Sequence, residues 1–185
     1  KRWILIILIS LITCVAILAA GVGRWIGEGW TAMSKQNVRE SVIAGSWYPG
    51  DPATLTKDIK GYLAQVPEHK VDGERVALIS PHAGYIYSGQ VAAYSYKLLE
   101  GRHYDIVVIV APSHHARFHG AAVYPRGGFR TPLGVVPVAE AIADELLDKS
   151  PITNSLPDAH AQEHSLEIQL PFLQVVLKDF KLVPI

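Results

Sequence analysis

The chain has 185 residues, 49% of them hydrophobic, which is enough apolar material for one sizeable α/β core. Its 17 Lys and Arg residues balance 17 Asp and Glu residues without forming a basic cluster, which argues against nucleic acid as a partner. The only cysteine, Cys14, excludes a disulfide framework within the chain.

Residues 3–23 form a nearly unbroken apolar stretch that carries no charge. About 20 such residues suffice for a helix to cross a hydrocarbon layer of roughly 30 Å. Lys1 and Arg2 precede the stretch, and their charge favours an inner N-terminus with the later residues on the outer face. We therefore predict a transmembrane signal anchor at residues 1–24, or alternatively a cleaved signal peptide, followed by a linker at 25–37. Both alternatives place the domain on the extracytoplasmic side, and the anchor makes the membrane a partner.

Residues 38–185 alternate between short apolar runs and segments of helical periodicity, which predicts one α/β domain. Helices are expected at residues 53–65, 90–100, 138–149 and 159–170, the first capped by Asp51 or Thr54. Strands are expected at residues 76–80, 106–111, 121–124 and 182–185, with a loop rich in Gly and Pro at 126–134. Because the chain stops within a strand pattern, we expect the domain to be incomplete at its C-terminus.

Two of the predicted strands run into a proline that is followed within two residues by a histidine. These are Pro81-His82 after the strand at 76–80 and Pro112-Ser113-His114 after the strand at 106–111. The helical segment between them completes a βαβ unit, whose parallel strands deliver both turns to one edge of the sheet. Either histidine alone is typical of a hydrogen-bonded turn, but their matched positions favour a metal site, since imidazole binds iron, copper and zinc.

A second group of polar residues lies within the predicted helix at 159–170. His160 and His164 are one helical turn apart, and with Glu163 they match the inverted zinc-peptidase pattern His-x-x-Glu-His. If the segment packs over the strand ends, His164 instead serves as an acid or base, with Glu163 or Glu167 orienting its ring. A solvated polar helix face is the third interpretation.

Five motifs follow one another in order along the chain. They are residues 44–51 (AGSWYPGD), 81–89 (PHAGYIYSG), 111–115 (APSHH), 131–134 (TPLG) and 163–172 (EHSLEIQLPF). Together they resemble the MEMO family, named for a mediator of ErbB2-driven cell motility and known in prokaryotes as the B protein of the AmmeMemoRadiSam system. The resemblance runs from about Val38 to Ile185.

The resemblance implies a fold similar to class III extradiol dioxygenases, which bind non-haem iron(II) at strand ends. We therefore expect a three-layer sandwich with a mainly parallel central sheet. The resemblance makes His82 and His114 ligands of iron(II) or copper and places His164 in the pocket, where we expect it to act in catalysis with Glu163. It also implies a third ligand, a cysteine, that this chain does not carry; two histidines alone would hold iron(II) weakly.

The expected activity is redox chemistry on an unknown small substrate. We predict that Tyr85, Tyr87 and Thr131 contact this substrate, although the two tyrosines also suit a hydrophobic core. The alternative is a non-catalytic module that binds a peptide or phosphopeptide, as animal relatives are proposed to do. A zinc peptidase built on His160, Glu163 and His164 is the third hypothesis.

Overall fold

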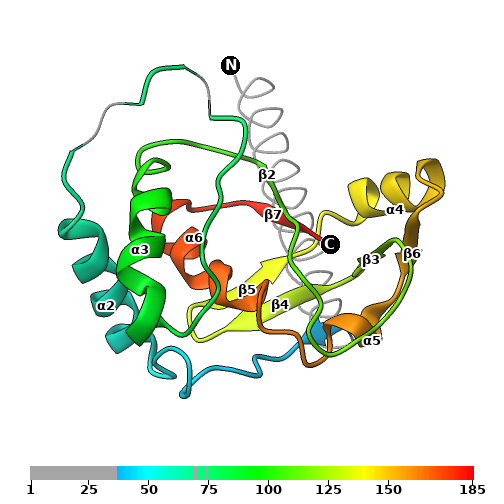
Figure 1. Ribbon diagram of the computed structural model, residues 1–185, viewed down its shortest axis with the longest axis horizontal. Coiled ribbons are helices and arrows are strands. Elements are labelled where there is room, and N and C mark those ends of the chain that lie inside the picture. The colour runs from blue at the N-terminus through cyan, green and yellow to red at the C-terminus, as the bar shows by residue number, and fades with distance from the viewer. Residues whose placement is uncertain (1–36, 69–70, 74) are drawn as a thin grey trace, which may run out of the picture. The chain divides into compact units, whose positions relative to one another are not determined.

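The computed structural model describes residues 37–68, 71–73 and 75–185, and the elements below belong to one unit, Val38–Ile185 (Figure 1). The predicted membrane segment at residues 1–24 lies outside the described residues, as does the predicted linker except Asn37. Among the described residues, every helix is too short or too polar to cross a membrane.

Seven strands in the described residues form three small sheets. Their bounds are β1 Val38–Arg39, β2 Ile106–Ile109, β3 Ala121–Val123, β4 Gly128–Thr131, β5 Gly134–Pro137, β6 Thr153–Ser155 and β7 Lys181–Pro184. Strand β4 lies between β1 and β5, β2 pairs with β7, and β3 pairs with β6. All pairings are parallel except β4 with β5. The backbone N–H of Ala139 donates to the carbonyl of Leu182 at 2.8 Å, which ties the end of β5 to β7.

The helices contribute half of the residues of the buried hydrophobic core. Their bounds are α2 Pro52–Ala64, α3 Tyr85–Lys97, α4 Glu140–Lys149, α5 Pro157–His160, the 3₁₀ turn η1 Glu167–Gln169 and α6 Leu170–Val176. Helices α2, α3 and α6 gather together in Figure 1. The ring of Phe172 on α6 is fully buried among them, 4.9 Å from the ring of Tyr96 and 5.1 Å from that of Tyr85.

The predicted helix at 53–65 is confirmed as α2, and its start follows from local chemistry. The Asp51 carboxylate accepts a hydrogen bond from the Thr54 backbone N–H at 2.8 Å, and Pro52 occupies the first turn. Leu55, Ile59 and Leu63 are buried and form one apolar stripe along the helix. The predicted strands at 106–111, 121–124 and 182–185 are also present as β2, β3 and β7.

The predicted strand at 76–80 is wrong, because this segment pairs with no strand among the described residues. The side chains of Val76 and Ile79 are 93% and 96% exposed. Apolar β-branched composition favours a strand only where a neighbouring edge supplies hydrogen bonds, and here β2 forms its ladder with β7 instead. The α/β class is thus confirmed, but the described residues form three small sheets, one mixed and two parallel, rather than one central sheet of a three-layer sandwich.

Two further segments differ from the sequence prediction. The predicted loop at 126–134 contains β4 and the turn into β5, where the Leu133 N–H donates to the Thr131 hydroxyl at 3.0 Å and Gly134 takes a φ of +121°. The predicted helix at 159–170 is interrupted, since α5 ends at His160 and η1 begins at Glu167. The residues between them form the centre of the candidate site.

Candidate functional site

The two histidine-bearing turns converge, as the sequence predicts. His82 lies on the turn before α3, and His114 lies in the loop after β2. Their ring centroids are 5.3 Å apart. The His82 turn reaches this place without a strand before it, because the Tyr85 N–H donates to the carbonyl of Trp47 at 2.8 Å.

His164 brings a third imidazole to the same place from the segment between α5 and η1. Its ring lies 4.5 Å from the ring of His114, nearly parallel to it, and 6.2 Å from the ring of His82. Ligand atoms of His114, Glu163 and His164 lie within 4.8 Å of one another. The structure therefore brings together His82, His114, Glu163 and His164, which were the four residues predicted for metal binding and catalysis.

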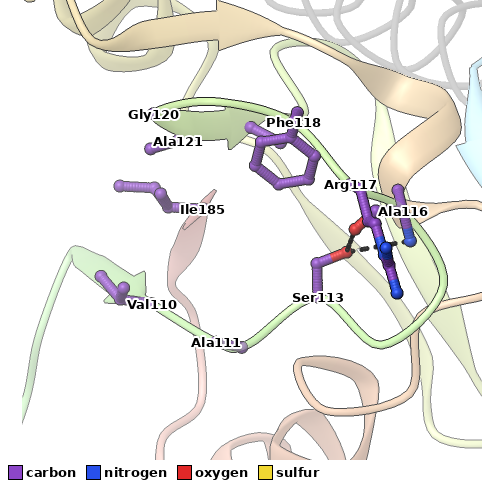
Figure 2. A pocket seen from close by; sticks show the side chains of 10 residues that line it. Val110, Ala111, Ser113, Ala116, Arg117, Phe118, Gly120, Ala121 and Ile185 are labelled. Carbon is purple, nitrogen blue, oxygen red and sulfur yellow. Dashed lines mark hydrogen bonds between the residues drawn. The ribbon is translucent and has the colours of Figure 1, made fainter.

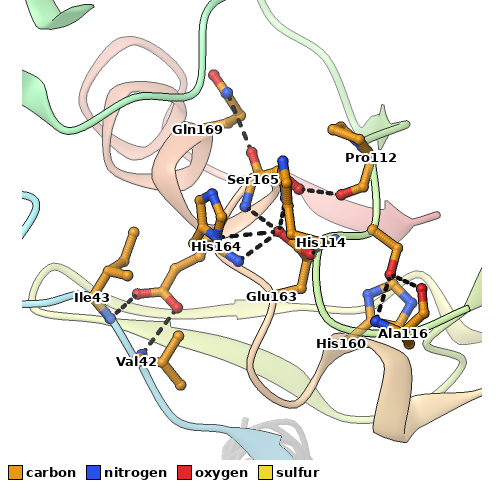
Figure 3. Close-up of polar contacts among 12 residues, drawn as sticks. Val42, Ile43, Pro112, His114, Ala116, His160, Glu163, His164, Ser165 and Gln169 are labelled. Carbon is orange, nitrogen blue, oxygen red and sulfur yellow. Dashed lines mark hydrogen bonds and ion pairs between the residues drawn. The ribbon is translucent and has the colours of Figure 1, made fainter. Parts of the chain in front are cut away.

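Glu163 is the buried carboxylate that organises this cluster (Figure 3). One oxygen accepts the His114 backbone N–H at 2.5 Å, and the other accepts the backbone N–H groups of His164 at 2.8 Å and Ser165 at 2.9 Å. Burial by itself raises the pKa of Glu163, but these hydrogen bonds outweigh it and lower the pKa to about 2. Glu163 is therefore ionised across the physiological range.

The same carboxylate determines which nitrogen of His114 faces outward. The Nδ1 atom of His114 lies 2.9 Å from Oε1 of Glu163. An ionised carboxylate can only accept hydrogen bonds, so Nδ1 carries the proton and donates it. When the ring is neutral, Nε2 keeps its lone pair, which is the arrangement found where a carboxylate orients a metal-binding histidine.

The ring of His164 is more enclosed than that of His114 and has a second aromatic neighbour. Its centroid lies 4.4 Å from the ring of Trp47, and its Nδ1 atom lies 3.4 Å from Oε1 of Glu163. Burial lowers the pKa of His164, and the neighbouring His114 and His82 act in the same direction. His164 thus favours the neutral form, which can accept a proton.

Glu167 does not orient the His164 ring, although the sequence left this role open to it. Its fully buried carboxylate pairs with the guanidinium of Arg39 and accepts hydrogen bonds from the hydroxyls of Ser41 at 2.5 Å and Tyr48 at 2.7 Å. This network connects β1 and the segment after it to η1, so Glu167 stabilises the fold. Glu163, in contrast, contacts the imidazoles of His114 and His164.

The zinc-peptidase pattern does not form one face of a helix. Helix α5 ends at His160, whose buried ring directs Nε2 to the carbonyl of Ala122 at 3.2 Å. His164 lies beyond the interruption and faces His114 instead. The pattern needs both histidines one turn apart on a continuous helix, and the structure separates them.

The three predicted substrate contacts have different environments. Tyr85 is buried, and its hydroxyl donates to the carbonyl of Ile168 at 3.0 Å. Thr131 is also buried, and its hydroxyl donates to the Gln174 side chain at 2.6 Å. Tyr87, at the start of α3, is 84% exposed. The structure thus leaves a free phenol only at Tyr87 among these three.

Sequence reasoning assigned no role to Trp47, Ser165 and Gln169, all of which touch the cluster or its turns. Trp47 contacts the His164 ring, Ser165 bonds the His114 loop, and Gln169 bonds the His82 turn. All three lie inside motifs that the sequence comparison with the MEMO family singled out. Their contacts span more than 50 residues along the chain, so no local spacing could have found them.

A cavity of about 460 Å³ is lined in part by residues on both sides of His114 in the sequence, Ser113 and Ala116 among them. Figure 2 shows its mostly apolar walls, which include Val110, Phe118 and Ile185, with Arg117 and Ser113 beside them. The residues that line it do not include the clustered histidines. The candidate site is therefore the cluster of imidazoles with Glu163, and this cavity is separate from it.

A mixed α/β domain that gathers three imidazoles, two of them beside one buried carboxylate, is by its site a candidate metal-binding domain. The family model described as Memo-like protein matches residues 39–185. The chain belongs to the MEMO family.

Curated relatives carry the same family description. A MEMO1 family protein of Pyrococcus furiosus is 39% identical over 153 residues, which cover 80% of this chain and 52% of the relative. One of Thermotoga neapolitana is 38% identical over 159 residues, covering 80% of this chain and 57% of the relative. One of Sulfurisphaera tokodaii is 36% identical over 159 residues, covering 80% and 56%. The chain thus spans about half the length of the curated relatives it matches.

Proposed function

We propose that the domain binds a redox metal, iron(II) or copper, through His82 and His114 and uses it in dioxygenase-like chemistry on a small substrate. One observation carries the proposal. The rings of His82 and His114 lie 5.3 Å apart on separate turns, and Glu163 holds the second ring with Nε2 outward. A histidine oriented by a buried carboxylate is the usual arrangement around protein-bound metals.

The two proposed donors are of the right type for such a metal, but they are one fewer than the three protein groups of a facial triad. Imidazole nitrogen suits both iron and copper, and a neutral Nε2 lone pair is available on His114. When bound, the metal supplies the electron-transfer chemistry that protein side chains lack. Glu163 maintains the tautomer of His114, and the neutral ring of His164 accepts a proton at nitrogen. Trp47 packs against that ring and limits the access of water.

Among the predicted substrate contacts, the proposal retains Tyr87. Its exposed phenol lies on the first turn of α3, which begins three residues after His82. The hydroxyls of Tyr85 and Thr131 already have protein partners, so the proposal gives neither of them a substrate contact.

Metal titration of the full chain tests this proposal. Cu(II) or anaerobic Fe(II) is added to wild type, His82→Ala and His114→Ala, and binding is followed by isothermal calorimetry. His103→Ala is the matched control, since this exposed histidine pairs only with Asp105 among the described residues. We expect each site variant to lose at least about tenfold in affinity, within the range typical of metal-site changes, and the control to bind normally. Equal affinity in all four proteins would disprove the metal site.

A binding module without turnover is the second candidate, and the exposed Trp47 favours it. This side chain is 37% exposed beside His164, and an accessible indole next to imidazoles suits an aromatic or phosphorylated peptide group. Binding of a synthetic phosphopeptide that persists in His82→Ala and His114→Ala but is lost in Trp47→Ala would support this module. Loss of peptide binding in all three variants would argue against it.

A further inference from the structure

One short segment is hydrogen-bonded to both histidine-bearing turns. The Ser165 hydroxyl donates to the carbonyl of Pro112 at 2.8 Å, two residues before His114 (Figure 3). The Gln169 side-chain amide donates to the carbonyl of Pro81 at 3.1 Å, immediately before His82. Two prolines that are 31 positions apart in sequence are thus held by two side chains four residues apart.

Both donor side chains are themselves fixed. Ser165 and Gln169 are buried; Gln169 ends η1, which begins two residues after Ser165. The Tyr96 hydroxyl donates to the Gln169 carbonyl oxygen at 2.5 Å, which directs the amide nitrogen toward Pro81. The same nitrogen also contacts the Ser165 carbonyl at 3.3 Å. The hydrogen bonds to both turns therefore come from one buried segment, residues 165–169.

Each turn has another contact, since the Tyr85 N–H donates to the Trp47 carbonyl and the His114 N–H donates to Glu163, but neither of these contacts is at the proline. The residues before Pro81 pair with no strand among the described residues, and Pro112 lies beyond the end of β2. Proline has no N–H, so neither turn can be secured by a backbone donor at that residue. In each turn, a hydrogen bond from a buried side chain to the proline carbonyl takes the place of backbone pairing with a strand.

We propose that Ser165 and Gln169 are positioning residues that together set the separation of His82 and His114. Gln169 acts through His82, and Ser165 acts through His114. The inference rests on the proposed function in one respect, because the separation matters for a metal that both histidines bind.

The test places Gln169→Met and Ser165→Ala in three backgrounds of the full chain: wild type, His82→Ala and His114→Ala. Cu(II) affinity and the electron paramagnetic resonance spectrum, which reports bound nitrogen ligands, are recorded for each. We expect Gln169→Met and Ser165→Ala each to weaken binding about tenfold in wild type and to add nothing in His82→Ala or His114→Ala, because the separation of the two histidines matters only where both are present. The spectrum of each variant should match that of the histidine variant through which it acts.

A general loss of stability would lower affinity equally in both histidine backgrounds, and that result would overturn the inference. Tyr96→Phe is a milder second variant, because it removes the hydrogen bond that orients the Gln169 amide but keeps the amide itself. We expect it to lower Cu(II) affinity in the same way as Gln169→Met, but by less. Crystal structures of Gln169→Met and Ser165→Ala supply a measurement that needs no metal. A separation of the two rings still at 5.3 Å in both structures would overturn the positioning role. A wild-type copper spectrum that is insensitive to His82→Ala and His114→Ala would instead disprove the proposed function.

Discussion

The carboxylate of Glu163 binds both the ring and the backbone of His114. One oxygen lies 2.9 Å from the ring Nδ1 atom, and the other accepts the backbone N–H at 2.5 Å. Two contacts to one residue leave the imidazole little freedom to rotate, so Glu163 sets the direction in which Nε2 points.

Glu163→Gln is expected to lower the affinity for Cu(II) or Fe(II) by about 10- to 100-fold, the range seen when a metal ligand loses its supporting carboxylate. The neutral amide keeps one oxygen but replaces the other with an N–H₂ group, which opposes the donors now facing Glu163. Calorimetric titration measures the change. Glu145→Gln, an exposed carboxylate that pairs with Lys149 on α4, is the control. Unchanged affinity in Glu163→Gln would show that the carboxylate has no part in metal binding.

Glu167→Gln is expected to destabilise the domain without acting on the imidazoles. Removing one member of a buried ion pair leaves the other charge uncompensated, at a cost of about 3 kcal/mol or more in the free energy of unfolding. The Arg39 guanidinium would be that uncompensated charge. Urea denaturation followed by circular dichroism measures the loss, with Glu145→Gln again as the control. A Glu167→Gln protein as stable as wild type would contradict the assigned role.

The stabilising effect of Glu167 should disappear in acid. Burial alone raises its pKa, but the Ser41 hydroxyl and the Arg39 guanidinium outweigh burial and lower the pKa from the ordinary value of 4.5. The folded state therefore binds fewer protons than the unfolded state, and the stabilisation is complete above pH 4.5 and lost as the pH falls through the folded-state pKa.

Urea denaturation of wild type and Glu167→Gln at a series of pH values below about 6 tests this dependence. The difference in unfolding free energy between the two proteins should narrow steadily as the pH falls. Other carboxylates titrate in both proteins, so their contributions cancel in the difference. A gap that stays constant down to the acid transition would show that the pKa of Glu167 is the same in the folded and unfolded states.

The sequence predicted α2 well because everything that starts this helix lies nearby in the chain. Asp51 caps it, Pro52 begins it, and Leu55 and Ile59 bury one face. The strand predicted at 76–80 failed for the opposite reason, since a strand needs a partner edge that composition does not reveal. Local chemistry was therefore a good guide to helix ends and a poor guide to sheet pairing.

The candidate site, too, could be predicted from the sequence only in part. Matched positions after two apolar runs identified His82 and His114, and the structure brings their rings together. The helix predicted through Glu163 failed because its carboxylate accepts the backbone N–H groups of His164 and Ser165, which a continuous helix would use for its own ladder. The interruption that removed the helix is what directs His164 toward His114.

Gly89 and Gly61 provide a matched pair that tests the packing of α3 against α2. A Cβ atom at Gly89 would lie 2.8 Å from the Tyr62 ring, whereas one at Gly61 on α2 would meet nothing within 4 Å. Gly89→Ala should therefore lower the unfolding free energy by about 1–3 kcal/mol through overpacking. Gly61→Ala should raise it by about 0.5–1 kcal/mol, because alanine loses less conformational freedom in a helix than glycine. Urea denaturation measures both, and a stabilising Gly89→Ala would mean that the Tyr62 ring moves aside at no cost.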